Sequence, residues 1–94
     1  MPRIKTEELL VILDTGDFKA IRLKGLQNGS FYMMIESAKG SFIHESADGR
    51  IKEYPKADNA LAWLKRKASV KEVVVDIEIW QADSEKRLGR ELGE

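Results

Sequence analysis

The sequence predicts an α+β domain in which two helices pack on one face of a mostly antiparallel five-stranded sheet, in the order α-β-β-β-β-α-β. Three observations support this class. Apolar and polar residues alternate with the period of a half-buried strand in residues 21–24 and 72–81. An Asn-Gly and an Asp-Gly dipeptide, both strong hairpin signals, separate strand-like segments. Residues 6–14 and 58–68 instead carry helix start signals and apolar stripes.

The first helix is expected over residues 6–14. Thr6 is the predicted N-cap, because its hydroxyl can accept a free backbone N–H of the first turn. Glu7 and Glu8 then lie near the positive end of the helix dipole, and Gly16 suits the helix end.

Four strands are expected next, joined by tight turns. Residues 18–24 form the first, because Ile21 and Leu23 alternate with Arg22 and Lys24. The other three are bounded by glycine or proline and cover residues 30–36, 41–45 and 50–54. Strands in such a series are expected to pair as an antiparallel meander, with primed turns that need positive φ at both central residues.

The second helix is expected over residues 58–68, with Asp58 as its N-cap and Leu61, Leu64 and Ala68 on the face that covers the sheet. A last strand over residues 72–81 completes the sheet. Its core-facing side carries four apolar residues, Val73, Val75, Ile77 and Ile79, and its other side carries Val74, Asp76, Glu78 and Trp80.

Length and composition favour one folded domain over residues 1–81, followed by a polar and flexible tail over residues 82–94. The chain holds 16 basic and 16 acidic side chains, so a long-range field that would attract nucleic acid is missing. It has no cysteine and no apolar run long enough to cross a membrane. We therefore expect a cytoplasmic protein that makes no membrane contact.

No cofactor, metal site or enzymatic activity is expected. The single histidine, His44, has Ser41, Glu45 and Ser46 nearby in sequence, but neighbours on a strand point to opposite faces. Glu45 therefore cannot easily orient His44 for catalysis, and an ordinary histidine on the sheet surface is the preferred interpretation. No glycine-rich phosphate-binding motif occurs.

The leading functional hypothesis is a non-enzymatic accessory or protein-interaction module that binds a protein partner or self-associates as a homodimer. The expected strand faces place Tyr32, Met34, Val74 and Trp80 on the side of the sheet opposite the helices. Aromatic residues and methionine on a partly exposed face are enriched at protein interfaces. The last strand would also present an open edge that can pair with a second copy.

The alternative hypothesis is a nucleic-acid-binding regulator that uses local basic patches. Arg22 and Lys24 form one patch, and Lys65, Arg66 and Lys67 form another at the end of the second helix. If the two patches converged they could contact phosphates. Acidic side chains on the same sheet face, such as Glu36 and Asp76, could instead neutralise the first patch. A third basic cluster, Lys86, Arg87 and Arg90, lies in the tail.

Four segments together, RIKTEELLVIL, GDFKAIRLKG, EYPKADNALAWLKRK and VKEVVVDIEIWQ, resemble the small ParC-family proteins associated with partition on bacterial plasmids and integrative elements. These are distinct from the topoisomerase subunit of similar name. The resemblance covers about residues 3–81 and rests on general layout, without a diagnostic motif. It implies a bacterial cytoplasmic accessory protein encoded near a partition ATPase, with no established active site to carry over.

Overall fold

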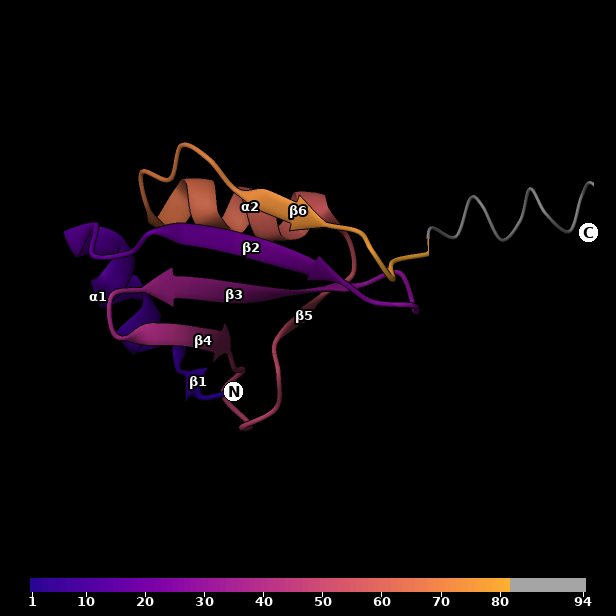
Figure 1. The fold of residues 1–94 in the computed structure, drawn as a ribbon, viewed down its shortest axis with the longest axis horizontal. Helices are drawn as coiled ribbons and strands as arrows, with labels where there is room; N and C mark the ends of the chain where they lie inside the picture. The colour runs from indigo at the N-terminus through magenta and orange to yellow at the C-terminus, as the bar shows by residue number, and fades with distance from the viewer. Residues whose placement is uncertain (82–94) are drawn as a thin grey trace, which may run out of the picture.

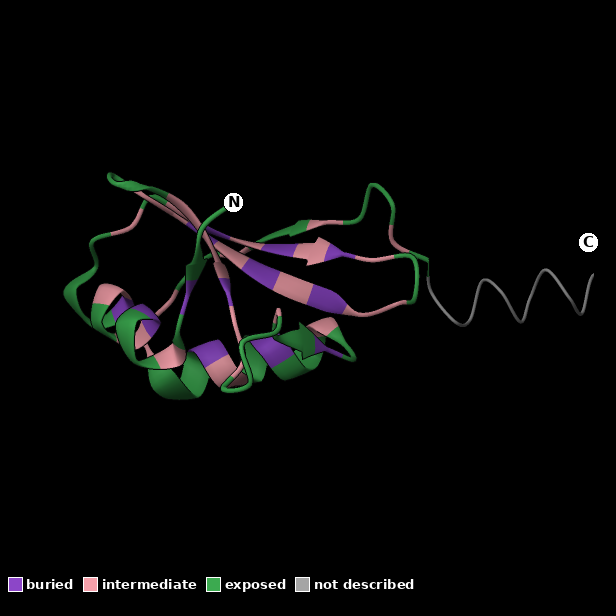
Figure 2. Cartoon of the chain, turned by 90° about the horizontal axis from the view of Figure 1, so that it is seen from below, coloured by how far each residue is buried: buried purple, intermediate pink, exposed green. Residues whose placement is uncertain are grey.

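The computed structural model describes residues 1–81, which form two layers: a mixed sheet, and two helices that cover one of its faces (Figures 1 and 2). The elements in chain order are β1 (Arg3–Ile4), α1 (Thr6–Thr15), β2 (Ala20–Gly25), β3 (Phe31–Ser37), β4 (Gly40–His44), β5 (Glu53–Tyr54), α2 (Ala57–Lys67) and β6 (Val74–Asp76). The α+β class and the two helices are confirmed. The sheet face without helices is called the open face below.

The sheet has six strands rather than the expected five, in the order β1-β4-β3-β2-β6, and β5 pairs with β3 instead of extending a meander. The pairs β2–β3, β3–β4 and β3–β5 are antiparallel, but β1–β4 and β2–β6 are parallel. The second parallel pair has a simple cause, because α2 crosses over the sheet between β5 and β6, and such a crossover lets the chain return in the same direction. The additional strand β1 has only two residues, too few to show alternation in the sequence.

The core lies between the sheet and the helices. Strands β2 and β3 alternate as predicted, and their buried members all face the helices. The buried side chains include Leu9 and Leu13 of α1, Leu64 and Ala60 of α2, and Ile21, Leu23, Phe31, Met33 and Ile35 of the two central strands. This arrangement follows from the period-two pattern of the sequence, which makes one face of each central strand apolar.

The two predicted turns have a different geometry from the one expected. Within these two turns only Gly29 and Gly49 have positive φ, at 90° and 84°. In each loop the preceding side chain accepts a backbone N–H two residues ahead of itself: Asn28 from Ser30 at 2.9 Å, and Asp48 from the following Arg50 at 3.1 Å. The prediction of a primed turn with two positive φ values was therefore wrong. The side-chain acceptors stabilise a longer loop in which only the glycine has a left-handed backbone conformation.

Both predicted helix N-caps were also wrong. The capping positions are Lys5 and Lys56, one and two residues earlier than expected. The Thr6 hydroxyl shares a hydrogen bond with His44 instead of capping α1. At α2, the Asn59 side chain accepts the backbone N–H of Lys56 at 3.1 Å, so the helix begins before Asp58. A tertiary hydrogen bond at Thr6 and the cap supplied by the Asn59 side chain therefore override the two local signals.

The last strand is much shorter than the expected residues 72–81. The carboxylate of Asp76 accepts the N–H of Glu78 at 3.0 Å, and the N–H of Trp80 bonds to the carbonyl oxygen of Ile77 at 3.2 Å. These bonds turn the chain away from the β2 ladder after Asp76. The alternation therefore predicts correctly that Val75 faces the helix side, but the strand is shorter than expected. Val75, Ile77 and Ile79, expected on the core-facing side, are exposed.

Helix α2 is rotated relative to the expected orientation. Leu64 is buried as predicted, but Leu61 is 39% exposed. Ala60 is buried instead, and Trp63 packs against the core. An indole ring removes more apolar area from water than a leucine side chain does, so the rotation that covers Trp63 leaves Leu61 outside.

Candidate functional site

Three of the four predicted contact residues share the open face of the sheet. Met34 lies opposite Arg22, which lies beside Val74 on the neighbouring strand, and Tyr32 lies opposite Lys24. Tyr32 and Met34 are half-buried, whereas Val74 is exposed. The predicted face is therefore confirmed for Tyr32, Met34 and Val74, and their role as contact residues stays a prediction.

The basic side chains of the open face are matched by carboxylates. The Arg22 Nε and the Glu36 Oε1 are 2.6 Å apart, and the Lys24 Nζ and the Asp76 Oδ2 are also 2.6 Å apart. The hydrogen bond from Lys24 lowers the pKa of Asp76, and the same bond raises the pKa of Lys24. The neutralisation that the sequence allowed is thus present for Glu36 and Asp76.

The two predicted basic patches do not converge. Lys65, Arg66 and Lys67 are exposed in the last turn of α2, on the helix side of the sheet, whereas Arg22 and Lys24 lie on the open face. A single phosphate backbone cannot lie against both sides of a sheet at once. The third basic cluster, Lys86, Arg87 and Arg90, lies outside the described residues.

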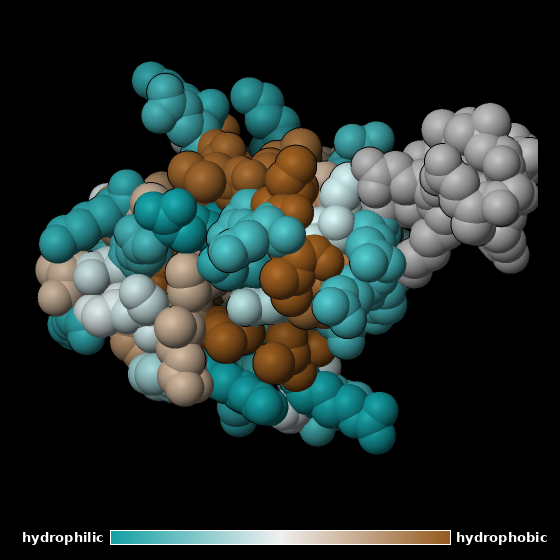
Figure 3. Space-filling view, turned by 45° about the vertical axis from the view of Figure 1, so that its right-hand side comes forward, coloured by the Kyte–Doolittle hydropathy of each residue, from teal (hydrophilic) through white to brown (hydrophobic). Residues whose placement is uncertain are grey.

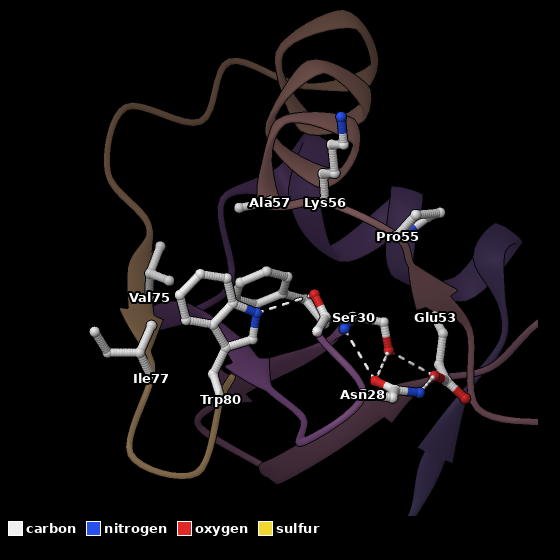
Figure 4. A pocket seen from close by; sticks show the side chains of 11 residues that line it. Asn28, Ser30, Glu53, Pro55, Lys56, Ala57, Val75, Ile77 and Trp80 are labelled. Carbon is white, nitrogen blue, oxygen red and sulfur yellow. Dashed lines mark hydrogen bonds between the residues drawn. The ribbon is translucent and has the colours of Figure 1, made fainter. Parts of the chain in front are cut away.

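Trp80 does not lie on the open face, and this placement corrects the prediction. After the turn at residues 77–80 its ring returns to the helix side, with its centroid 5.5 Å from that of Phe31. The indole Nε1 donates a hydrogen bond of 2.9 Å to the carbonyl oxygen of Gly29 (Figure 4). A Cβ at Gly25 would lie 2.4 Å from the Cβ of Trp80, so only glycine admits this packing. Because Trp80 ties the segment that follows β6 to the fold, Trp80→Ala would disturb stability and interaction together.

Exposed apolar side chains concentrate on β6 and the residues that follow it. Val74, Val75, Ile77 and Ile79 are between 41% and 57% exposed. The sheet order ends at β6, so within residues 1–81 no strand pairs with its outer edge. The space-filling view shows hydrophobic side chains gathered at the surface near the end of the described chain (Figure 3). An apolar surface at an open sheet edge is a site where another strand can add.

Two hollows, which share Val75, separate β6 from α2. One has a volume of ≈ 740 Å³ and includes Ile77 and Ala57, and the other, of ≈ 460 Å³, includes Val73 and Leu61. We call the surface formed by these five residues the β6 trough. Val75 lies beside the buried Leu23 of β2, so the trough is on the helix side of the sheet.

The end of the trough near the 26–30 loop has a polar rim. Glu53 accepts hydrogen bonds from the hydroxyl of Ser30 at 2.7 Å and from the amide of Asn28 at 3.3 Å (Figure 4). These two bonds lower the pKa of Glu53. The Glu53 carboxylate therefore already has two hydrogen-bond partners in the loop of its own chain. The apolar part of the trough is the stronger candidate for binding.

His44 is buried, which corrects the expected surface position. Its side chain is 2% exposed, its Nε2 shares a hydrogen bond of 2.8 Å with the Thr6 hydroxyl, and its ring packs 5.4 Å from that of Trp63. Burial lowers the pKa of His44 to about 4, and the positive charge of Lys52 acts in the same direction. A covered, neutral imidazole has no access to a substrate in this structure.

Other kinds of site find little support in the part of the chain that the structure describes. No group of three or more metal-ligating side chains occurs within residues 1–81. Over the same residues, neither helix has the length and apolar character needed to cross a bilayer.

The sequence reasoning missed Leu61, Val75 and Ile77 as surface residues. One signal was present, because Asp76 interrupts the apolar run, and aspartate is disfavoured in strands and favours local turns.

Comparison with family models, with curated proteins and with solved structures found no match to this chain. The resemblance to the ParC-family proteins therefore stays a prediction.

Proposed function

We propose that this chain is a non-enzymatic, cytoplasmic interaction module that self-associates, with the β6 edge and the β6 trough as the contact surface. The supporting observation is that the exposed apolar side chains of β6 coincide with the unpaired edge of the sheet within residues 1–81. Leu61 of α2 adds a further exposed apolar side chain to the same surface.

Covering this surface would stabilise an assembly through the hydrophobic effect. Each square ångström of apolar surface removed from water contributes about 25 cal/mol, and burial of one valine or isoleucine side chain contributes roughly 1.5–3 kcal/mol. Each of these side chains is already partly buried in the single chain. An assembly therefore gains only from burying the apolar area that is still exposed. Several such side chains on one edge can still offset the entropy lost on association.

A second copy of the chain is the partner that the charges favour. The 16 basic and 16 acidic side chains cancel, so two copies approach without net repulsion. The ion pairs of the open face also neutralise Arg22 and Lys24 next to β6. A two-fold symmetric dimer uses the same surface on both copies and therefore needs only one apolar edge.

Sedimentation equilibrium of the full chain tests this proposal. We expect the wild type to be a dimer and Val75→Lys to be a monomer, because the variant places an ammonium group in the surface that must lose water. Val11→Lys is the matched control, since Val11 is 62% exposed on α1, where it lines a hollow with Phe42 of β4 rather than with β6. It should leave the dimer intact, and circular dichroism should show that both variants are folded.

Two results would contradict the proposal. A wild-type chain that sediments as a monomer at all concentrations up to about millimolar has no useful self-affinity. A Val75→Lys variant that dimerises as tightly as the wild type would place the contact elsewhere. In that case Tyr32 and Met34 of the open face would be the next positions to change.

The link to plasmid partition is a separate proposal that rests on the resemblance to the ParC-family proteins alone. It expects a gene for a partition ATPase beside the gene for this chain. Repeated occurrence of the gene within metabolic operons would contradict it, without affecting the proposed dimer.

A further inference from the structure

We infer that two copies join their sheets through antiparallel pairing of β6 with β6 of the second copy, with Val75 at the two-fold axis. This inference rests on the proposed self-association and adds the geometry of the contact. It requires the outer edge of β6 to be free, and within residues 1–81 the sheet order ends at this strand.

The faces of the sheet restrict the possible registers. Val75 lies beside Leu23 and faces the helices, whereas Val74 and Asp76 lie beside Arg22 and Lys24 and face the open side. In a continuous antiparallel sheet, directly opposite side chains point to the same face. A two-fold axis perpendicular to the sheet must therefore place one residue of β6 opposite its own copy.

Three registers meet this condition, centred on Val74, Val75 or Asp76. The register centred on Asp76 places two aspartates opposite each other, and the register centred on Val74 places Glu72 opposite Asp76 of the second copy. Like charges directly opposite one another are destabilising in a sheet. The Val75 register avoids both contacts, since Val74 then lies opposite Asp76 of the second copy. It would bring Glu72 opposite Glu78 only beyond the strand, where the chain has already turned away after Asp76.

The Val75 register also matches the apolar side chains on the helix side. Val75 meets Val75 of the second copy. The residues that flank the strand, Val73 and Ile77, come opposite each other where the pairing extends one residue beyond β6 at each end. All three residues line the β6 trough, so the second strand would enter the space beside Leu61. This would explain why Leu61 is exposed on a helix whose other large apolar residues, Trp63 and Leu64, pack against the core. The added strand would complete the layer that α2 overlies.

The position of Asp76 is compatible with this contact. Its carboxylate is held by Lys24 of its own chain at 2.6 Å, and it also accepts the backbone N–H of Glu78. The carboxylate that lies opposite Val74 of the second copy therefore keeps its hydrogen-bond partners within its own chain. The chain turns away after Asp76, which limits the paired segment to a few residues on each copy.

Disulfide cross-linking of the full chain tests the register. The wild-type chain has no cysteine, so every cross-link comes from the introduced residue. Val75→Cys should form a disulfide-linked dimer on mild oxidation, because directly opposite Cα atoms lie about 4.5–5.5 Å apart, within the range of disulfides. Val11→Cys, which is more exposed, is the control for random collision. We expect its rate to be lower by on the order of tenfold or more.

A mixture of Val73→Cys and Ile77→Cys chains should cross-link faster than either variant alone. Faster cross-linking in a mixture of Val73→Cys and Val75→Cys would instead indicate the Val74 register and overturn this inference. A dimer by sedimentation in which Val75→Cys and Val11→Cys react equally slowly would overturn the β6 contact but not self-association. A monomeric Val75→Cys variant whose introduced thiol is protected from thiol reagents would indicate that residues 82–94 of the same chain cover the edge, and would overturn both proposals.

Discussion

His44 shows how a single residue can be placed in a way that its neighbours in sequence do not reveal. Its strand position was expected to face water, but it points between the sheet and α2, where it contacts Thr6 and Trp63. Its Nδ1 has no hydrogen-bond partner within residues 1–81. A buried imidazole in this setting is stable only in its neutral form, because the charged form would lose the hydration it has in water.

This burial predicts a loss of stability in mild acid. The pKa of His44 is about 4 in the folded chain and 6.5 ordinarily, so the unfolded chain binds a proton first as the pH falls. The free energy of unfolding is therefore highest above pH 6.5 and decreases as the pH falls toward 4. Between pH 7 and pH 5 we expect the free energy of unfolding to drop by about 2 kcal/mol, measured by urea denaturation.

His44→Gln should remove most of this pH dependence, because its side chain can still reach Thr6 but does not titrate. Thr6→Ala is the matched control, since it removes the hydrogen bond and keeps the imidazole, so its stability should still fall in acid. The carboxylates with lowered pKa, Asp48, Glu53 and Asp76, bind protons only at lower pH and contribute little in this range. An unchanged slope in His44→Gln would contradict the assignment to His44.

Residue faces were predictable where a strand is central and where its two sides differ strongly. Ile21, Leu23 and Met33 are buried as the alternation indicated. Trp80 was assigned to the wrong face because the strand was expected to continue through residue 80. A side chain that follows a turn is placed by the turn, and periodicity holds no information about it.

Helix α2 illustrates the same difficulty at the scale of an element. Its existence and approximate length follow from its apolar spacing, but its rotation depends on which large side chain the sheet can accommodate. Trp63 packs against His44, and this contact turns Leu61 toward β6. Since His44 was expected on the surface, the space that receives Trp63 could not be foreseen.

Two leucines of α2 should therefore differ in their effect on stability. Leu64→Ala should cost about 2–5 kcal/mol, because Leu64 is fully buried and the substitution leaves a cavity. Leu61→Ala should cost less than about 1 kcal/mol in the monomer, since Leu61 is partly in water already. Urea denaturation at low protein concentration measures both values. Equal costs would contradict the rotation of α2 described above.

The predicted elements also show which connections a sequence specifies. The turn positions were correct, because Gly29 and Gly49 supply backbone conformations that other residues rarely adopt. The second turn, however, closes only an isolated bridge between Glu45 and Ile51, and the expected strand over residues 50–54 is reduced to Glu53–Tyr54. The parallel placement of β6 beside β2 was missed, because a crossover through α2 joins strands that are far apart in the chain and leaves no local signal. The candidate site depends on this placement. The sequence could therefore predict that the last strand has an open edge, but it could not predict the β6 trough between that strand and α2.

At the scale of the whole molecule, the two faces of the sheet differ in what covers them. The helices cover one face, and ion pairs make the open face compatible with water. Apolar surface is left mainly where the sheet ends, at β6. The two basic patches lie on opposite sides of the sheet, and the net charge is zero, so the overall charge distribution favours contact between copies over contact with nucleic acid.

Self-association predicts that thermal stability depends on protein concentration. When folded dimers unfold to separate chains, each tenfold increase in concentration stabilises the dimer by about 1.4 kcal/mol, so the wild-type Tm should rise across a dilution series. Val75→Lys should unfold at a Tm that does not change with concentration, because its folded form is a monomer. Val11→Lys should follow the wild type. A wild-type Tm that is constant over a roughly hundredfold range, measured by circular dichroism, would show that β6 is left uncovered in solution or is covered within one chain.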